Sequence, residues 1–178
     1  MTPQTALLMA KYNRWMNERM YDAAASLPES AVIADMKAFF GSIFGTLNHI
    51  AVADTIWLHR FSQQEPSFPS LTVLSELPHP ASLRQALAAD LSGLREYRSR
   101  LDNIIEQWAA ELTANRLSGD ISYTNTAGVT FRRNLGALVQ HFFNHQTHHR
   151  GQVSTLLFQC GVDVGVTDLL TLIPSDDA

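Results

Sequence analysis

The sequence contains little cysteine and little charge, and each shortage narrows the class of protein. Its single cysteine, Cys160, cannot form an internal disulfide, so nothing in the chain calls for an oxidising compartment. Charged residues make up 17% of the 178 residues, against roughly a quarter in an average soluble protein. The low charge content, together with 46% hydrophobic residues, excludes a disordered chain. It also indicates that much of the chain's surface is buried in a core, lines a pocket or contacts a partner.

Basic clusters and long apolar runs are scarce as well. The net charge is −4, and the one basic pair is Arg132-Arg133, too little for the phosphate contacts that drive nucleic-acid binding. No uninterrupted apolar stretch reaches the roughly 18 residues of a membrane span. The N-terminal apolar residues are broken by Lys11, Asn13 and Arg14 before a signal-peptide core could form. We therefore expect a cytoplasmic protein with no nucleic-acid or membrane partner.

The spacing of apolar residues predicts an all-α protein, with residues 1–178 forming a single domain. Helical spacing is sustained over four stretches, which we expect to be helices at 3–27, 40–62, 83–112 and 134–160. The second of these is apolar almost all round, apart from His49, Asp54 and Arg60. A protein with four such helices is expected to fold as a four-helix bundle.

The segments between these helices indicate how the helices are connected. Residues 63–81 hold four of the seven prolines and no sustained periodicity, which predicts a long crossover connection. Residues 29–38 are polar and fit one short turn of helix. The alternating segment within 117–133, around Ala127-Gly128, predicts a small hairpin or an ordered loop.

Four of the seven histidines are crowded into nine residues of the last predicted helix, at 141, 145, 148 and 149. At 100° per residue, His149 falls inside the stripe of leucine, valine and phenylalanine that should face the core. His145 lies at the edge of that stripe, whereas His141 and His148 lie progressively outside it. Residues four apart stack on one helix face, so His145 and His149 are the best-placed chelating pair.

Two inward imidazoles at leucine positions favour a metal site. Burying them costs several kcal/mol unless each finds a partner, and one divalent cation satisfies both. The alternative is a pair of hydrogen-bonded core histidines. His49 is the natural third ligand, because its neighbours Gly45 and Ala53 leave room beside it. For His49 too, the alternative is a lone core histidine bonded to an acceptor.

The residue after the first histidine of the pair excludes one zinc chemistry. Metalloproteases with a His-Glu-x-x-His motif carry a glutamate there as general base, and this chain has Gln146. Two nearby polar residues are candidates for catalytic roles. Gln152 either orients a ligand imidazole, contacts substrate, or is an ordinary boundary residue. His141 is a candidate fourth ligand or proton carrier.

Two charged residues are expected to point toward apolar faces of their helices. Asp54 and Arg150 would each need a partner there, so we expect a buried ion pair between them or separate supporting roles near the site. His59 and His79 fall near a helix end and in a proline-rich loop. Both are expected to be solvated.

Three segments of the chain resemble the DinB (damage-inducible) family of the DinB/YfiT-like superfamily of metalloenzymes. The strongest is the last-helix signature His141-Phe-Phe-Asn-His-Gln-Thr-His-His-Arg-Gly-Gln152. The others are Tyr12-Asn-Arg-Trp-Met-Asn17 and, within 42–60, the pattern Ser42, Thr46-Leu-Asn-His49, Asp54, Trp57-Leu58 and Arg60. Together they cover nearly the whole chain in the expected order.

The resemblance implies a four-helix bundle with a three-histidine divalent metal site. The implied ligands are His49, His145 and His149, and His148 falls where relatives often carry tyrosine. Histidine ligation suits zinc, nickel, copper or iron, with zinc and nickel the leading candidates. Characterised branches of the superfamily are thiol-dependent transferases and isomerases that use bacillithiol or mycothiol.

We therefore expect a metal-dependent enzyme, either a thiol-dependent S-transferase with a low-molecular-weight thiol cofactor or a small-molecule hydrolase. The alternative is a non-catalytic metal- or ligand-binding stress-response protein. The expected partners are a small-molecule substrate or thiol, and a second copy of the chain in a homodimer.

Overall fold

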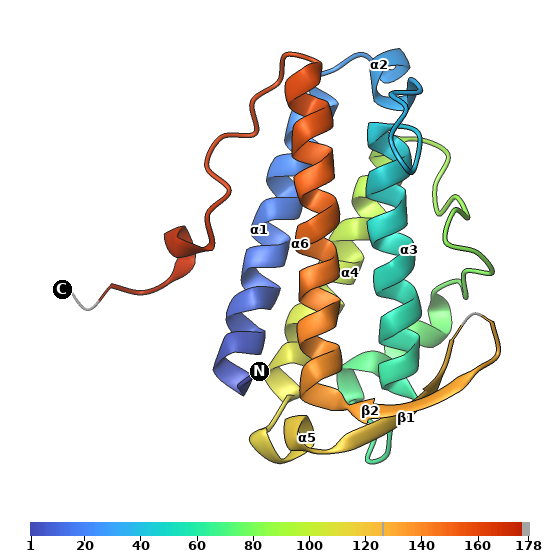
Figure 1. Ribbon diagram of the computed structural model, residues 1–178, viewed down its shortest axis with the longest axis vertical. Helices are drawn as coiled ribbons and strands as arrows, with labels where there is room; N and C mark the ends of the chain where they lie inside the picture. Colours follow the sequence, from blue (N-terminus) through green and yellow to red (C-terminus); the bar gives the residue numbers. More distant parts are fainter. Residues whose placement is uncertain (126, 176–178) are drawn as a thin grey trace.

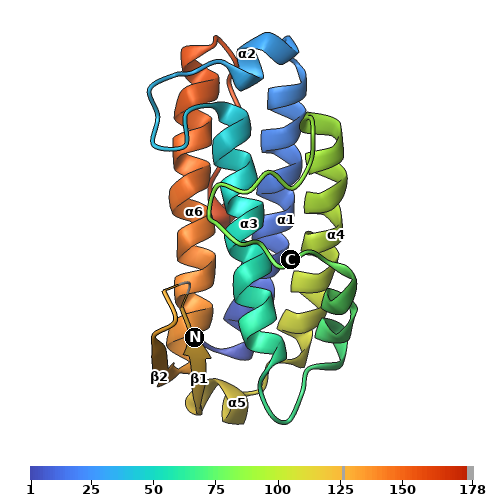
Figure 2. The same ribbon diagram turned by 90° about the vertical axis from the view of Figure 1, so that its right-hand side faces the viewer.

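The computed structural model describes residues 1–125 and 127–175, and its described part is mostly helical. Four long helices stand side by side in a bundle (Figures 1 and 2), with bounds α1 (Pro3–Ala25), α3 (Ile43–Ser62), α4 (Leu91–Glu111) and α6 (Leu135–Gln159). Helix α1 packs against α4 and α6, and α3 packs against the same two helices. The predicted all-α four-helix bundle is confirmed.

The long connection after α3 determines the directions of the helices. It returns from the lower end of α3 to the upper end of α4 in Figure 1, so α3 and α4 run the same way while α1 and α6 run the opposite way. A 3-10 helix, η1 (Pro69–Glu76), covers part of this connection and packs on α3 and α4. The predicted crossover is confirmed, but it extends further along the chain than the prolines indicated.

Helix α4 begins at Leu91, so the prediction that it starts at residue 83 is wrong. Asp90 caps it by accepting a hydrogen bond from the Gly93 N–H at 2.8 Å. The preceding residues lie in the crossover, where the Asn48 side chain of α3 forms hydrogen bonds with backbone groups that a helix would pair internally. The Asn48 amide donates to the Gln85 carbonyl at 2.8 Å and accepts from the Leu87 N–H at 2.9 Å.

Short elements close the two ends of the bundle. Helix α2 (Glu29–Ile33) forms the short turn expected in 29–38, and α3 begins at Ile43 with the Ser42 side chain as its cap. After α5 (Ala114–Ser118), strands β1 (Asp120–Thr124) and β2 (Thr130–Asn134) pair antiparallel, which confirms the hairpin. The hairpin lies at the lower end of the bundle beside α3 and α6 (Figure 1).

The C-terminal segment turns back along the outside of the bundle after α6 (Figure 1). It carries the 3-10 helix η2 (Leu169–Leu172) and is tied to α1 by two hydrogen bonds to its backbone. Tyr12 donates to the Thr167 carbonyl and Arg19 to the Val164 carbonyl, each at 2.7 Å. None of the helices in the described residues is long and apolar enough to cross a membrane.

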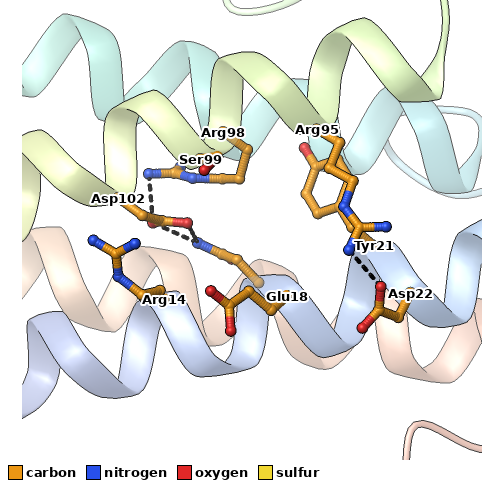
Figure 3. Close-up of a pocket in the computed structure, with 9 residues that line it drawn as sticks. Arg14, Glu18, Tyr21, Asp22, Arg95, Arg98, Ser99 and Asp102 are labelled. Carbon is orange, nitrogen blue, oxygen red and sulfur yellow. Dashed lines mark hydrogen bonds and ion pairs between the residues drawn. The ribbon is translucent and has the colours of Figure 1, made fainter.

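A hollow of about 270 Å³ lies on the bundle surface between α1 and α4 (Figure 3). Three arginines and three carboxylates share its wall, namely Arg14, Arg95, Arg98, Glu18, Asp22 and Asp102. Each of the arginines is ion-paired, and two of them pair with a carboxylate outside the hollow. The positive and negative charges of the hollow are therefore balanced.

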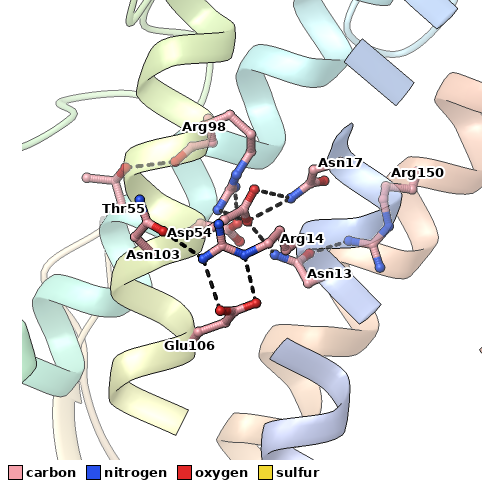
Figure 4. A network of polar contacts seen from close by, with 11 residues as sticks. Asn13, Arg14, Asn17, Asp54, Thr55, Arg98, Asn103, Glu106 and Arg150 are labelled. Atoms are coloured by element: carbon pink, nitrogen blue, oxygen red, sulfur yellow. Dashed lines mark hydrogen bonds and ion pairs between the residues drawn. The ribbon is translucent and has the colours of Figure 1, made fainter. Parts of the chain in front are cut away.

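Beneath this hollow, a buried polar network joins all four helices (Figure 4). Arg98 of α4 is ion-paired with Asp54 of α3 and, at 2.9 Å, with Asp102 one turn further along α4. Asp102 also accepts hydrogen bonds from Asn13 and Asn17 of α1, both at 2.9 Å. Each of these five residues is at most 2% exposed, so the network holds α1, α3 and α4 together inside the bundle.

Helix α6 joins the same network through Arg150. Its guanidinium donates to the Asn13 amide oxygen and, at 3.2 Å, to the Thr147 hydroxyl. Arg150 directly follows His149 in the sequence. The network therefore fixes the position of the helix that carries two of the predicted metal ligands.

Candidate metal centre

Three imidazoles from two neighbouring helices meet on one side of the bundle. His49 comes from α3, and His145 and His149 come from α6, one helical turn apart. One ring nitrogen of each lies within 4.8 Å of the other two. His49 is 3% and His149 9% exposed, and His145 is half-buried. The structure thus brings together the three residues that the sequence singled out.

The spacing of the ring nitrogens suits a metal ion. The Nε2 atom of His145 lies 3.4 Å from Nε2 of His49 and 3.1 Å from Nε2 of His149. Two nitrogens bound to one tetrahedral zinc ion at about 2.0–2.1 Å lie about 3.3 Å apart. These residues fit a divalent cation with only small side-chain adjustments.

Hydrogen bonds at the far nitrogens direct lone pairs toward the centre of the cluster. Nδ1 of His49 lies 3.1 Å from the Leu83 carbonyl oxygen, which can only accept, so Nδ1 carries the proton and Nε2 presents a lone pair. Nδ1 of His149 donates in the same way to the Gln152 side-chain oxygen at 2.7 Å. His145 Nε2 faces both lone pairs and can donate a proton to only one. A cation would satisfy all three nitrogens.

Burial keeps these imidazoles neutral near pH 7. Together with a smaller effect of the neighbouring histidines, it lowers the pKa of His145 to about 3. It also lowers the pKa of His49 to about 4, although the hydrogen bond to Leu83 opposes the shift. The pKa of His149 is likewise lowered by burial, against the effect of Gln152. Neutral imidazoles are the form that binds metals.

The crossover and the segment before α3 cover the cluster. The Phe40 ring stacks on His49 with 3.7 Å between ring centroids and meets His149 edge-on at 5.6 Å. The Arg84 guanidinium lies 5.1 Å from the Phe40 ring centroid. Phe40 therefore shields one face of the cluster from water, and Arg84 places a positive charge at its edge.

Gln152 makes the contact expected for one of the roles predicted for it, because its side-chain oxygen accepts a hydrogen bond that orients the His149 ring. Its amide nitrogen also lies 3.4 Å from Nε2 of exposed His148. His141 lies outside the cluster, with its ring 6.1 Å from that of His145 and 5.3 Å from that of Trp57. Burial and the charge of Arg60 lower the His141 pKa, so it too is neutral near pH 7.

Two predictions about polar residues need correction. Asp54 and Arg150 are both buried, but an ion pair between them is wrong, because Asp54 is paired with Arg98 and Arg150 donates to Asn13. His59 is 7% exposed instead of solvated, and its ring stacks on that of exposed His79 at 3.7 Å.

Gln146 stands at the general-base position of a zinc protease and is fully buried inside the bundle. It therefore lies among the core residues of α6, which agrees with the exclusion of that mechanism.

Sequence reasoning missed two groups around the centre. Arg98 and Asp102 could have been found, because they share a face of α4 with Leu94, Leu101 and Ile105, where buried charges must pair. Phe40 and Arg84 gave no such signal. Phe40 stacks on His49 and Arg84 lies beside Phe40 only because two irregular segments fold back onto α3.

Comparisons with known proteins agree with this architecture. The family model described as DinB family matches residues 1–176, a range that includes the four long helices and the three histidines. The chain is also similar to the protein named "Protein DinB" of Bacillus subtilis (strain 168). The two are 24% identical over 164 residues, which cover 92% of this chain and 90% of that protein.

Proposed function

The chain belongs to the DinB family, and from this membership and its three converging imidazoles we propose that it is a metal-dependent enzyme. In this proposal His49, His145 and His149 hold a divalent ion, with zinc or nickel the leading candidates. The observation that supports it most strongly is the pair of Nε2 lone pairs aimed at the third imidazole. When bound, the ion would act as a Lewis acid that lowers the pKa of a thiol or water at the open position.

Besides binding the ion, the chain's own residues have three tasks in this proposal. The Leu83 carbonyl and Gln152 hold two ligand rings in the metal-binding tautomer. Phe40 excludes water from one face of the site. His141 is exposed, uncharged and adjacent to His145, so it can accept a proton from the reacting group and pass it to solvent.

The nucleophile is proposed to come from outside the chain. Within the described residues, no serine, threonine, cysteine or carboxylate side chain is hydrogen-bonded to the three imidazoles. The single cysteine, Cys160, lies eleven residues beyond His149, or about 16 Å along α6. A low-molecular-weight thiol is therefore the favoured nucleophile, which makes an S-transferase the leading reaction class and hydrolysis of a small molecule the second.

Metal analysis of the untagged protein tests the site. We expect about one ion per chain in the wild type and almost none in a His145→Ala/His149→Ala variant. His148→Ala is the matched control, because that exposed imidazole lies on the same helix outside the cluster and its loss should leave the metal content unchanged. Equal, near-zero metal in the wild type and the double variant would contradict the proposal.

Catalysis is tested by offering the metal-loaded protein small thiols together with electrophiles and following the thioether product. Turnover that disappears in the double variant is expected. No turnover with any thiol, combined with strong thermal stabilisation by metal, would favour a non-catalytic metal-binding protein instead.

A further inference from the structure

A second hollow, of about 240 Å³, lies further along the helix face that carries His49. Ile56 and Arg60 line it, and they follow His49 by seven and eleven residues, spacings that return to the same side of a helix. Its other walls come from α3, the crossover and the hairpin, namely His59, Gln63, His79, Pro80, Thr124 and Asn125. Figure 2 shows the hairpin on one side of the lower part of α3 and the crossover on the other.

The Arg60 guanidinium is held in place by aromatic rings. It lies 4.6 Å from the Trp57 ring centroid and 5.2 Å from that of Tyr123, and the residue is half-buried. Within residues 1–125 and 127–175 it has neither an ion pair nor a side-chain hydrogen bond. Its planar set of N–H donors is therefore oriented but available.

A row of rings connects this arginine to the candidate metal centre. The Trp57 ring that supports Arg60 lies 5.3 Å from the His141 ring, and His141 in turn lies 6.1 Å from His145. Along α3 the hollow extends from the level of Ile56, about 10 Å from His49, to the level of Arg60, about 16 Å from it. A single elongated molecule can therefore reach from the histidines to the hollow.

The charge of the hollow determines which ligand it suits. Arg60 is its one formally charged lining residue, and burial lowers the pKa of His59, which keeps that imidazole neutral. The hollow between α1 and α4 is different, because its three arginines face three carboxylates and each of those arginines is ion-paired. The hollow beside Arg60 is therefore positive, whereas the hollow in Figure 3 is neutral.

We infer that the hollow beside Arg60 binds a carboxylate of the same substrate whose other end is held at the three histidines. Arg60 forms a bidentate, charge-assisted contact with the carboxylate. The rings of Trp57 and Tyr123 hold the guanidinium in the plane of the carboxylate. This inference rests on the proposed metal-dependent function. It narrows the substrate to an elongated acid with at least about 10 Å between its metal-binding atom and its carboxylate.

The experiment uses cobalt-loaded protein and two thiols of equal length, 8-mercaptooctanoate and 8-mercapto-1-octanol. Binding of each thiol is followed by the cobalt–sulfur absorption band, which gives a Kd without any need for turnover. The wild type is expected to bind the acid at least about tenfold more tightly than the alcohol, as a charge-assisted contact provides. Arg60→Gln is expected to abolish this preference, and Arg60→Lys to keep only part of it.

Two controls separate the Arg60 contact from general effects of charge and folding. Arg100→Gln removes an equal charge from an exposed ion pair on α4 and is expected to keep the full preference. Cobalt affinity and circular dichroism of Arg60→Gln are expected to match the wild type. A preference that survives in Arg60→Gln, or none in the wild type, would overturn the inference while the metal site stands. Failure of the wild type to bind cobalt would overturn the proposed function first, and this inference with it.

Discussion

Removal of Arg98 should destabilise the protein more than any surface substitution. The Arg98 side chain is 3% exposed and forms the ion pairs of two buried carboxylates, Asp54 and Asp102. Asp102 would keep its hydrogen bonds from Asn13 and Asn17, but Asp54 would lose the one ion pair it makes. Breaking a buried pair in this way costs about 3–5 kcal/mol, a large part of the roughly 5–15 kcal/mol that stabilises a domain.

Equilibrium unfolding in urea at pH 7 measures this loss in an Arg98→Met variant. The loss should shrink at lower pH, because burial already raises the pKa of Asp54 to about 6 with Arg98 present. An acid whose pKa is higher in the folded state binds more protons there, so the folded state gains stability as the pH falls through that range. Without Arg98 the carboxyl should protonate even more readily.

Two further variants make the test specific. Arg98→Met/Asp54→Leu removes the stranded carboxylate and should recover part of the loss, a coupling that separate effects would not produce. Arg100→Met removes an exposed ion pair with Glu76 and should cost at most about 1 kcal/mol. A loss below 1 kcal/mol in Arg98→Met, or no recovery in the double variant, would refute the reasoning.

Three further predictions concern the surroundings of the histidines. Gln152→Ala removes the hydrogen bond that orients His149 and should weaken metal binding about 10–100-fold in a chelator competition; an unchanged Kd would contradict that role. Metal-free protein should lose stability as the pH falls from about 6.5 toward 3, because the unfolded chain protonates His145 in this window and the folded state does not. The slope for that residue is at most about 1.4 kcal/mol per pH unit, and urea titrations should show a steeper decline than in His145→Ala. Gly45→Ala places a methyl group against the Phe40 carbonyl and should cost about 1–3 kcal/mol by thermal melting, whereas a neutral effect would show that this segment moves freely.

Much of the fold follows from helical periodicity, and the error in α4 shows where periodicity stops being informative. Leu83 and Leu87 continue the leucine spacing of α4, yet they belong to the crossover. Asn48 satisfies the backbone of this segment from a different helix, a contact between residues far apart in sequence. The spacing of apolar residues cannot reveal such a contact, because it reports local geometry alone.

The candidate site was predictable in its histidines and less so in its supporting contacts. The angle of each residue on α6 separated His145 and His149 from the outward His148, and the structure brings that pair together with His49. The same reasoning identified Asp54 as a buried charge but named the wrong partner. A helical wheel shows that a charge faces inward but does not show which of three facing helices supplies the counter-charge.

X-ray absorption at the edge of the bound metal tests the central claim most directly, because it counts and identifies the ligand atoms. We predict three imidazole nitrogens at about 2.0–2.1 Å plus one exchangeable ligand for a zinc-type ion. Added thiol should replace the exchangeable ligand with a sulfur at about 2.3 Å. A first shell made of oxygen atoms alone, or one with fewer than three imidazoles, would contradict the account.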